Sequence, residues 1–287
     1  MENKIIYKKP KLQELTKEYT VVDPHFHSRY SDGINTIPTI VKHAKKLGIG
    51  IAITDHNEIK GAIEIDKYKG LLTIPGIEVT AKEGSHILIY FYDAEDLKKF
   101  YKDYIKPNMG NDIMSSTKLK MELIIKYAKR FKTVIIFPHP YSAAYTGVCN
   151  HNFNQERLKK LFSMVHGLEA INSENLNKWN MNSSLLAFNV GKAITGGSDG
   201  HTLYHMGKVV TYAKCKSDRT SFLNAIKKKQ TKVIGKEIDM LRKVTSNSFK
   251  LRKNLKNYPD LVEKNIKYSY SLFTHRTKKI KDFIIKR

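Results

Sequence analysis

The segment 21-VVDPHFHSRYSDG-33 places two histidines one residue apart, where a short β-branched run ends. Alternate residues of an extended chain project to the same side, so we expect the imidazoles of His25 and His27 side by side. Asp32 follows in the same loop. Imidazoles and carboxylates are common ligands of transition metals, and the spacing therefore raises the question of a metal site.

Further residues of the same type stand at the edges of later apolar runs. In chain order they are His56, Glu78, His86, His139, Asp199 and His201. Burying so many ionisable groups together would be costly without cations. The nine donors predict two or three divalent ions, and imidazole with carboxylate but no thiolate favours Zn, Mn or Fe over Mg, Ca or Cu.

The other histidines and the nearest cysteine are given different roles. Cys149, which lies close to His151, could join the metal site or be a thiol of a loop or of the core. A lone histidine after a strand is usually structural, and we expect that role for the remaining ones. These are His43, His151, His166, His205 and His275.

Short apolar runs alternate with amphipathic stretches, the pattern of strands joined by helices. The expected strands are 20–22, 49–53, 71–77, 87–92, 134–137, 167–171 and 193–195, with a later pair at 209–213 and 232–234. The expected helices are 37–47, 58–68, two within 94–131, 155–162, 177–189 and 219–229. This predicts an α/β barrel or a doubly wound sheet. Donors from at least five strand ends converge only if the strands close around an axis, which favours the barrel.

Composition limits the possible partners and compartments. The 287 residues include 41% hydrophobic residues and carry a net charge of +24. This charge predicts anionic partners, which could be nucleotides, acidic lipid or nucleic acid such as RNA or single-stranded DNA. Abundant Lys, Asn and Ile also fit an AT-rich genome. The two cysteines cannot form a disulfide framework, and no apolar run reaches the roughly 20 residues that cross a bilayer. We therefore expect a cytoplasmic protein without a membrane span, whose oligomeric state stays open.

Taken in order, the motifs resemble the PHP (polymerase and histidinol phosphatase) superfamily over about residues 19–235. They are His-x-His-x4-Asp-Gly, Thr-Asp-His, Gly-Ile-Glu-Val, a histidine before a strand, Pro-His-Pro and Gly-Ser-Asp-Gly-His. The resemblance implies a distorted seven-stranded (β/α) barrel with a trinuclear metal site. It assigns His25, His27, Glu78 and Asp199 to one ion, Glu78, His86 and His139 to a second, and Asp32, His56 and His201 to a third.

The predicted activity is metal-dependent phosphoester hydrolysis, because closely spaced ions lower the pKa of a bound water and clamp phosphoryl oxygens. The attacking hydroxide is expected near Glu78, Asp199 and His201. The Ser-Asp-Gly form at Asp32 resembles the stand-alone nucleotide and RNA phosphoesterases of the family. Nucleotides, nucleoside bisphosphates or short oligonucleotides are the expected substrates. The alternatives are a small-metabolite phosphatase that resembles histidinol phosphatase, and a non-catalytic metal-binding module in a nucleic-acid complex.

Four further residues near the expected ligands have open roles. Arg29 and Lys82 are candidates for binding the substrate phosphate, or are solvated surface charges. Asp23 and Asp55 either accept a hydrogen bond from a ligand imidazole or cap the following turns. The group that protonates the leaving group is not identified.

Residues 1–235 are expected to form the phosphoesterase domain and residues 236–287 a basic helical extension. The latter hold fifteen Lys/Arg against five Asp/Glu, a net charge of about +10. Helical spacing is shared by Ile238, Leu241, Val244, Leu251, Leu255, Leu261, Ile266 and Phe273. Two or three amphipathic helices, broken at Pro259, would pack on the barrel or extend the site as a basic track. In a track, Tyr268, Tyr270 or Phe273 could stack on bases.

Overall fold

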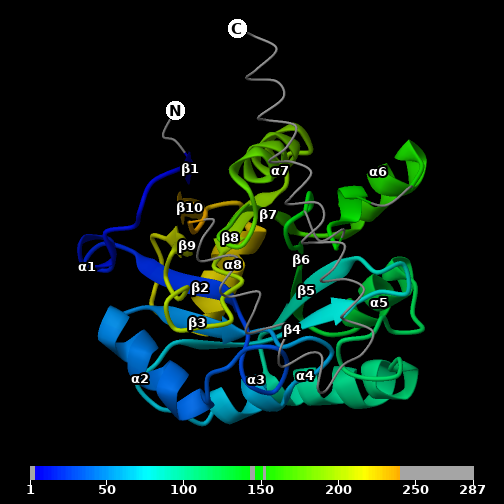
Figure 1. The fold of residues 1–287 in the computed structure, drawn as a ribbon, viewed down its shortest axis with the longest axis horizontal. Helices are drawn as coiled ribbons and strands as arrows, with labels where there is room; N and C mark the ends of the chain where they lie inside the picture. Colours follow the sequence, from blue (N-terminus) through cyan, green and yellow to red (C-terminus); the bar gives the residue numbers. More distant parts are fainter. Residues whose placement is uncertain (1–3, 143–145, 151–152, 240–287) are drawn as a thin grey trace, which may run out of the picture.

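The computed structural model describes residues 4–142, 146–150 and 153–239, which form an α/β fold around a curled sheet (Figure 1). The strands are β1 (Ile5–Ile6), β2 (Thr20–Phe26), β3 (Gly50–Ile53), β4 (Thr73–Thr80), β5 (His86–Phe91), β6 (Thr133–Phe137), β7 (Gly167–Asn172), β8 (Ala193–Gly197), β9 (Val209–Ala213) and β10 (Lys232–Gly235). The α-helices are α1 (Leu12–Leu15), α2 (Ile37–Leu47), α3 (Lys60–Ile65), α4 (Ala94–Phe100), α5 (Met121–Ala128), α6 (Gln155–Met164), α7 (Asn177–Asn189) and α8 (Arg219–Lys227). A π-helix (Tyr101–Ile105) and a 3₁₀ turn (Lys106–Asn108) follow α4, and a second 3₁₀ turn covers Val148–Asn150.

The sheet has the order β1-β10-β9-β2-β3-β4-β5-β6-β7-β8, and its last strand, β8, returns to β2 and β9. Phe26, at the end of β2, forms a parallel bridge with Gly200 after β8. The hydroxyl of Thr211 on β9 accepts from the amide of Gly196 at 2.8 Å and donates to its carbonyl at 2.7 Å. The barrel-like α/β fold is confirmed, but the described sheet has ten strands, because β1, β9 and β10 extend the seven strands β2 to β8.

Two strands run against the expected parallel direction. β5 pairs antiparallel with both β4 and β6, and β9 pairs antiparallel with β2 and β10. Only residues 81–85 connect β4 to β5, too few for the helical crossover that a parallel pair requires. As a result, the first residue of β5, His86, lies at the same end of the sheet as the last residues of the parallel strands.

Apolar side chains form two cores, one on each face of the curled sheet. The outer core lies between the sheet and the surrounding helices. The inner core contains Val22, Ile74 and Ile136 from three strands together with Phe222 and Ile226 from α8. Helix α8 therefore closes one end of the curl, and Figure 1 shows it against the inner side of the strands. The opposite end of the inner space is lined by polar side chains.

Local sequence signals account for the helix ends that were predicted well. Pro38 stands in the first turn of α2, and Gly48 ends that helix with a φ of 69°, a conformation that favours glycine. Asp93, Asn154 and Asp218 cap α4, α6 and α8 through their side chains. No helix among the described residues is both long and apolar enough to span a membrane. Residues 240–287, most of the predicted extension, lie outside the described residues.

Candidate metal centre

Glu78 of β4 lies at the centre of the polar end of the barrel and is buried. Its Oε2 atom lies 3.1 Å from His56 Nδ1 and 3.4 Å from Nε2 of both His25 and His27. Its Oε1 atom lies 3.0 Å from His86 Nδ1 and 3.3 Å from His139 Nε2. The two carboxylate oxygens thus face different groups of imidazoles, as a bridging ligand would.

All nine residues of the predicted ligand set meet at this end, and eight of them form three overlapping clusters of donor atoms. The clusters are His25, His27 and Asp199; His56, Glu78 and His86; and His27, Asp32, His56 and His201. Within each cluster the donor atoms lie within 4.8 Å of one another. The grouping resembles the predicted three sets, with three differences. His27 and His56 each belong to two clusters, Glu78 belongs to one cluster where two were predicted, and His139 contacts Glu78 without joining a cluster.

The donor atoms are arranged better for binding cations than for forming hydrogen bonds with one another. Among the described residues, several buried atoms of the site have no hydrogen-bond partner: His25 Nε2, both ring nitrogens of His27, His56 Nδ1, Glu78 Oε2 and His139 Nδ1. Leaving so many buried polar atoms unpaired would be costly. Ligands of one tetrahedral zinc ion, each at about 2.0–2.1 Å, stand roughly 3.3 Å apart, close to the separations around Glu78. The site can therefore hold divalent metal ions.

The backbone is strained where it aims these side chains. Positive φ angles occur at His139 (27°), Asp199 (51°) and Asn57 (45°), three of the four non-glycine residues with positive φ in the described ranges. Each such conformation costs about 1–2 kcal/mol and persists only where the surroundings enforce it. The Asn57 side chain donates to two carbonyl oxygens of the 109–120 loop and accepts from the amide of Thr80 at 3.0 Å, which fixes the turn after His56.

Charge within the site lowers the pKa of the Asp32, Glu78 and Asp199 carboxylates and raises the pKa of several ligand histidines. Burial opposes the ionisation of Glu78, but neighbouring histidines, led by His86 and His56, hold its pKa well below the usual range. Burial holds the pKa of His56 well below the usual range, so that imidazole is neutral. Burial also opposes a charge on His25, but carboxylates led by Asp199 raise its pKa well above the usual value. Binding of a cation must therefore displace a proton from His25.

Glu169 of β7 belongs to the site, and the sequence did not identify it. It is buried, and its Oε1 atom lies 3.1 Å from His25 Nδ1 while Oε2 accepts from the amide of His139 at 2.9 Å. The side-chain amide of Asn172 donates to Glu169 Oε2 at 2.9 Å and to Asp199 Oδ2 at 3.1 Å. The available signal was an acidic residue inside an otherwise apolar strand.

Asp23 and Asp55 cap turns and do not contact ligand imidazoles with a hydrogen bond. Asp23 accepts from the backbone amides of Ser198 at 3.0 Å and Gly207 at 2.9 Å. Asp55 accepts from the backbone amide of Ser28 at 2.7 Å and from two serine hydroxyls of the loop after β2. Of the two predicted roles, the turn-capping role is the one that the geometry supports.

The other candidate residues lie around the site. Arg29 and Lys82 are exposed, on the loop after β2 and on the β4–β5 turn, so both are at the metal-binding end. Burial raises the pKa of the Cys149 thiol to about 12, and Cys149 belongs to none of the three clusters found in the described ranges. His166 and His205 bond the backbone of Ile135 and the carboxylate of Glu174, respectively, which agrees with their predicted structural role. His151 and His275 lie outside the described residues.

Comparison with known proteins identifies the family. The PHP domain family model matches residues 23–215, which is more than half of the chain, and the chain belongs to this family. The prediction of a PHP-type metal-dependent phosphoesterase is confirmed at the level of this class. A relative from Methanocaldococcus jannaschii, uncharacterized protein MJ1587, is 28% identical over 172 residues, which cover 54% of this chain and 89% of the relative.

Solved structures share the fold at low sequence identity. A two-domain protein from Bacteroides vulgatus, containing a predicted PHP-like metal-dependent phosphoesterase, is 17% identical with a TM-score of 0.57 over 82% of this chain and 70% of its own. Endonuclease Q from Pyrococcus furiosus is 20% identical with a TM-score of 0.61 over 75% and 57% of the two chains. Endonuclease Q bound to a 27-mer duplex with an abasic lesion is 20% identical, with a TM-score of 0.60 over 73% of this chain and 57% of its own.

Proposed function

We propose that this chain uses two or three divalent ions, Zn, Mn or Fe, to hydrolyse phosphate esters of nucleotides, nucleoside bisphosphates or short oligonucleotides. The observation that carries the proposal is the convergence of nine metal-type ligand residues at one end of the barrel, five of which have buried atoms without a hydrogen-bond partner among the described residues. A buried set of this kind is costly unless cations compensate it. A complete donor set also argues against a non-catalytic relative in which ligands have been lost.

Bound ions would supply a nucleophile near neutral pH and positive charge that stabilises the phosphoryl oxygens in the transition state. The residues position that chemistry. Glu78 would bridge two ions, because its oxygens face different imidazole groups. His25 would present Nε2 to the ions, because Nδ1 donates to Glu169. Arg29 and Lys82, exposed at the same end, are the proposed contacts to the non-reacting phosphate or to a polynucleotide backbone.

Two observations support a nucleotide or nucleic-acid substrate over the phosphate ester of a small metabolite. The chain carries a net charge of +24, which concentrates polyanions near its surface. Its fold resembles that of endonuclease Q, which has been solved with a 27-mer duplex substrate that contains an abasic lesion. At 20% identity this likeness supports the proposal through the fold alone.

The test combines metal analysis with a substrate panel. Protein purified without chelator should contain more than one equivalent of Zn, Mn or Fe. It should hydrolyse a mononucleotide and a short oligonucleotide with higher kcat/KM than histidinol phosphate, and EDTA should abolish activity. Glu78→Gln should reduce both metal content and kcat/KM by more than about 100-fold, the upper end of the effect of residues that only orient ligands. Glu95→Gln, at an exposed glutamate of α4, is the matched control.

The outcomes separate the alternatives. Substoichiometric metal that no added ion restores would contradict the metal centre itself. Equal or better turnover of histidinol phosphate would support metal-dependent phosphoester hydrolysis but would indicate that the substrates are small metabolites. Stoichiometric metal without hydrolysis of any ester on the panel would point to a non-catalytic metal-binding module.

A further inference from the structure

Helix α7 differs from the other helices around the barrel in the residues that it buries. Its fully buried residues are Asn180, Ser183 and Ala187, all polar or small. Leu186 packs against the core, but three other large apolar residues face outward: Met181, Leu185 and Phe188 are 53%, 61% and 78% exposed. Spacings of four and three residues place these three side chains on one face of the helix. We call this face the α7 stripe.

The helix cannot bury the α7 stripe by rotating, because hydrogen bonds fix its inner face. The Asn180 side chain accepts from the Asn172 amide and donates to the Asn172 carbonyl, both at 3.0 Å. Ser184 donates to the Ala170 carbonyl at 3.2 Å and contacts the hydroxyl of Tyr7 at 2.5 Å. α7 lies at the edge of the molecule (Figure 1). Three adjacent exposed apolar side chains held outward by a fixed inner face are typical of a covered surface.

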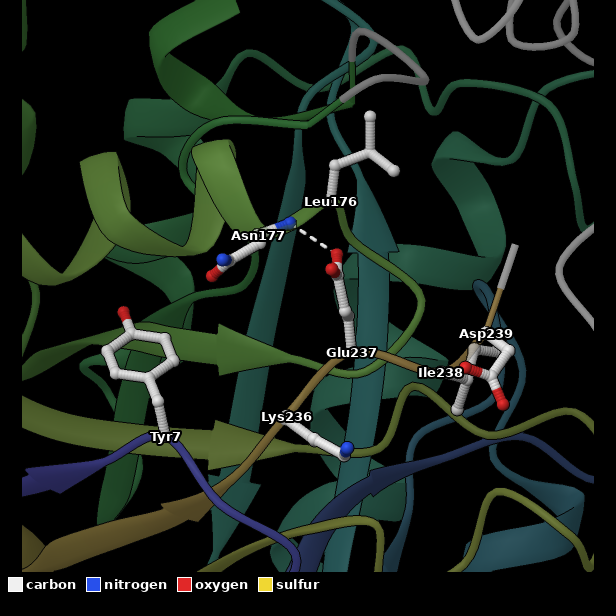
Figure 2. A pocket seen from close by; sticks show the side chains of 7 residues that line it. All are labelled: Tyr7, Leu176, Asn177, Lys236, Glu237, Ile238 and Asp239. Atoms are coloured by element: carbon white, nitrogen blue, oxygen red, sulfur yellow. Dashed lines mark hydrogen bonds between the residues drawn. The ribbon is translucent and has the colours of Figure 1, made fainter. Parts of the chain in front are cut away.

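The chain returns to α7 immediately after its last strand, β10. The backbone amide of Ile238 donates to the Ser173 carbonyl at 3.0 Å, and the Glu237 carboxylate accepts from the backbone amide of Asn177, the first residue of α7. Residues 236–239 enclose a cavity of about 320 Å³ together with Tyr7 and the start of α7 (Figure 2). The described chain therefore ends at Asp239, two residues after the residue that contacts the α7 N-terminus, and 48 residues follow it.

The sequence that follows has the composition of a partner for the α7 stripe. Residues 240–258 contain Leu241 and Val244, three apart, and Leu251 and Leu255, four apart. They contain six Lys/Arg and no Asp/Glu, so the face opposite these apolar residues is basic. A tethered segment of this kind competes at an effective concentration on the order of millimolar, far above that of a second protein molecule. These features favour an intramolecular partner over a second copy of the chain.

We propose that residues 240–258 of the same chain dock as an amphipathic helix on the α7 stripe, with their leucines against Leu185 and Phe188. A 19-residue helix is about 28 Å long and α7 about 20 Å, so one segment is sufficient to cover the stripe. The docked segment directs its basic face to solvent beside the C-terminal end of β7, which is the end that carries the metal centre.

Hydrogen exchange of the full-length chain, measured by mass spectrometry together with its mass in solution, tests the proposal. In the wild type, amides of 240–258 should exchange at least tenfold more slowly than in an unstructured peptide of the same sequence. Leu185→Asp should remove this protection while β2 to β8 stay protected. Met181→Asp is the second variant on the stripe, and Asn189→Asp, at an exposed polar residue of α7, adds the same charge as a matched control.

Each other outcome would overturn the proposal. Fast exchange of 240–258 in a monomeric wild type would show that this segment does not cover the α7 stripe. Protection that survives Leu185→Asp and Met181→Asp would place the segment elsewhere on the protein. A concentration-dependent dimer that Leu185→Asp dissociates, with 240–258 exchanging freely, would make a second copy the occupant.

Discussion

The Glu169 carboxylate orients three residues of the metal centre but is not itself one of the predicted metal ligands. It fixes the His25 tautomer through Nδ1, holds the backbone amide of His139, and orients the Asn172 amide that also reaches Asp199. A carboxylate behind a ligand imidazole raises its basicity and restricts its rotation. Glu169 thus acts as a positioning residue for ligands that come from three different strands or loops.

We expect Glu169→Gln to weaken metal binding about 10- to 100-fold, because its amide cannot accept from His25 and the His139 amide as the carboxylate does. The measurement is metal affinity by competition with a chromophoric chelator, and excess metal should restore most of kcat. Asp23→Asn is the matched control, since Asp23 is also buried beside the site but has no hydrogen bond to a ligand imidazole. Unchanged affinity in Glu169→Gln would contradict the positioning role.

At the scale of the elements, His166 joins the strands at the end opposite the site. Its Nδ1 atom accepts from the backbone amide of Ile135 at 3.0 Å, and its own amide donates to the Ile135 carbonyl at 2.9 Å. Burial, with the charges of Lys227, Lys129 and Lys192, lowers its pKa from 6.5 to about 4. A protonated imidazole cannot accept this hydrogen bond, so the β6–β7 pair depends on a neutral His166.

The direction of the pH effect follows from this shift. The unfolded chain takes up the His166 proton near pH 6.5 and the folded chain only near pH 4. The stabilisation is therefore complete above pH 6.5 and is lost as the pH falls towards 4. His166→Asn keeps an acceptor without a titrating group, and its free energy of unfolding should fall less than that of the wild type between pH 7 and pH 5. Urea unfolding in chelator measures both, and equal losses would contradict the prediction.

Strand and ligand positions were predictable because they depend on local pattern. Apolar runs located nine of the ten described strands, and only the two-residue β1 was missed. The antiparallel β5 could also have been predicted, because its connection to β4 is too short for a crossover. The role of Glu169 could not be predicted, since its partners His25 and His139 are 144 and 30 residues away. The exposed α7 stripe also escaped prediction, because a helix is expected to bury its apolar side chains.

At the scale of the whole molecule, the positive charge is distributed unevenly along the sequence. Residues 240–287 contain fourteen Lys/Arg and three Asp/Glu, a net charge of +11 out of the total of +24. A uniform lysine bias would give this segment only its share by length, about +4. The excess favours a specific anion-binding role for the segment over a genome-wide tendency towards lysine, and it agrees with the basic track predicted beside the metal centre.

If this segment forms the track, neutralising its distal lysines should affect long substrates only. In the full chain, replacing Lys278, Lys279 and Lys281 by Gln should reduce the log–log salt dependence of oligonucleotide kcat/KM by about 2, because each phosphate contact to a single strand contributes about 0.7. Mononucleotide hydrolysis should be unchanged, because one nucleotide occupies only the metal centre. The same change at three exposed lysines before β4 and β10, at the opposite end of the barrel, is the control: Lys67, Lys69 and Lys228. An equal effect of both triple variants would assign the salt dependence to total charge, and a parallel loss of mononucleotide activity would assign the distal lysines to the catalytic site.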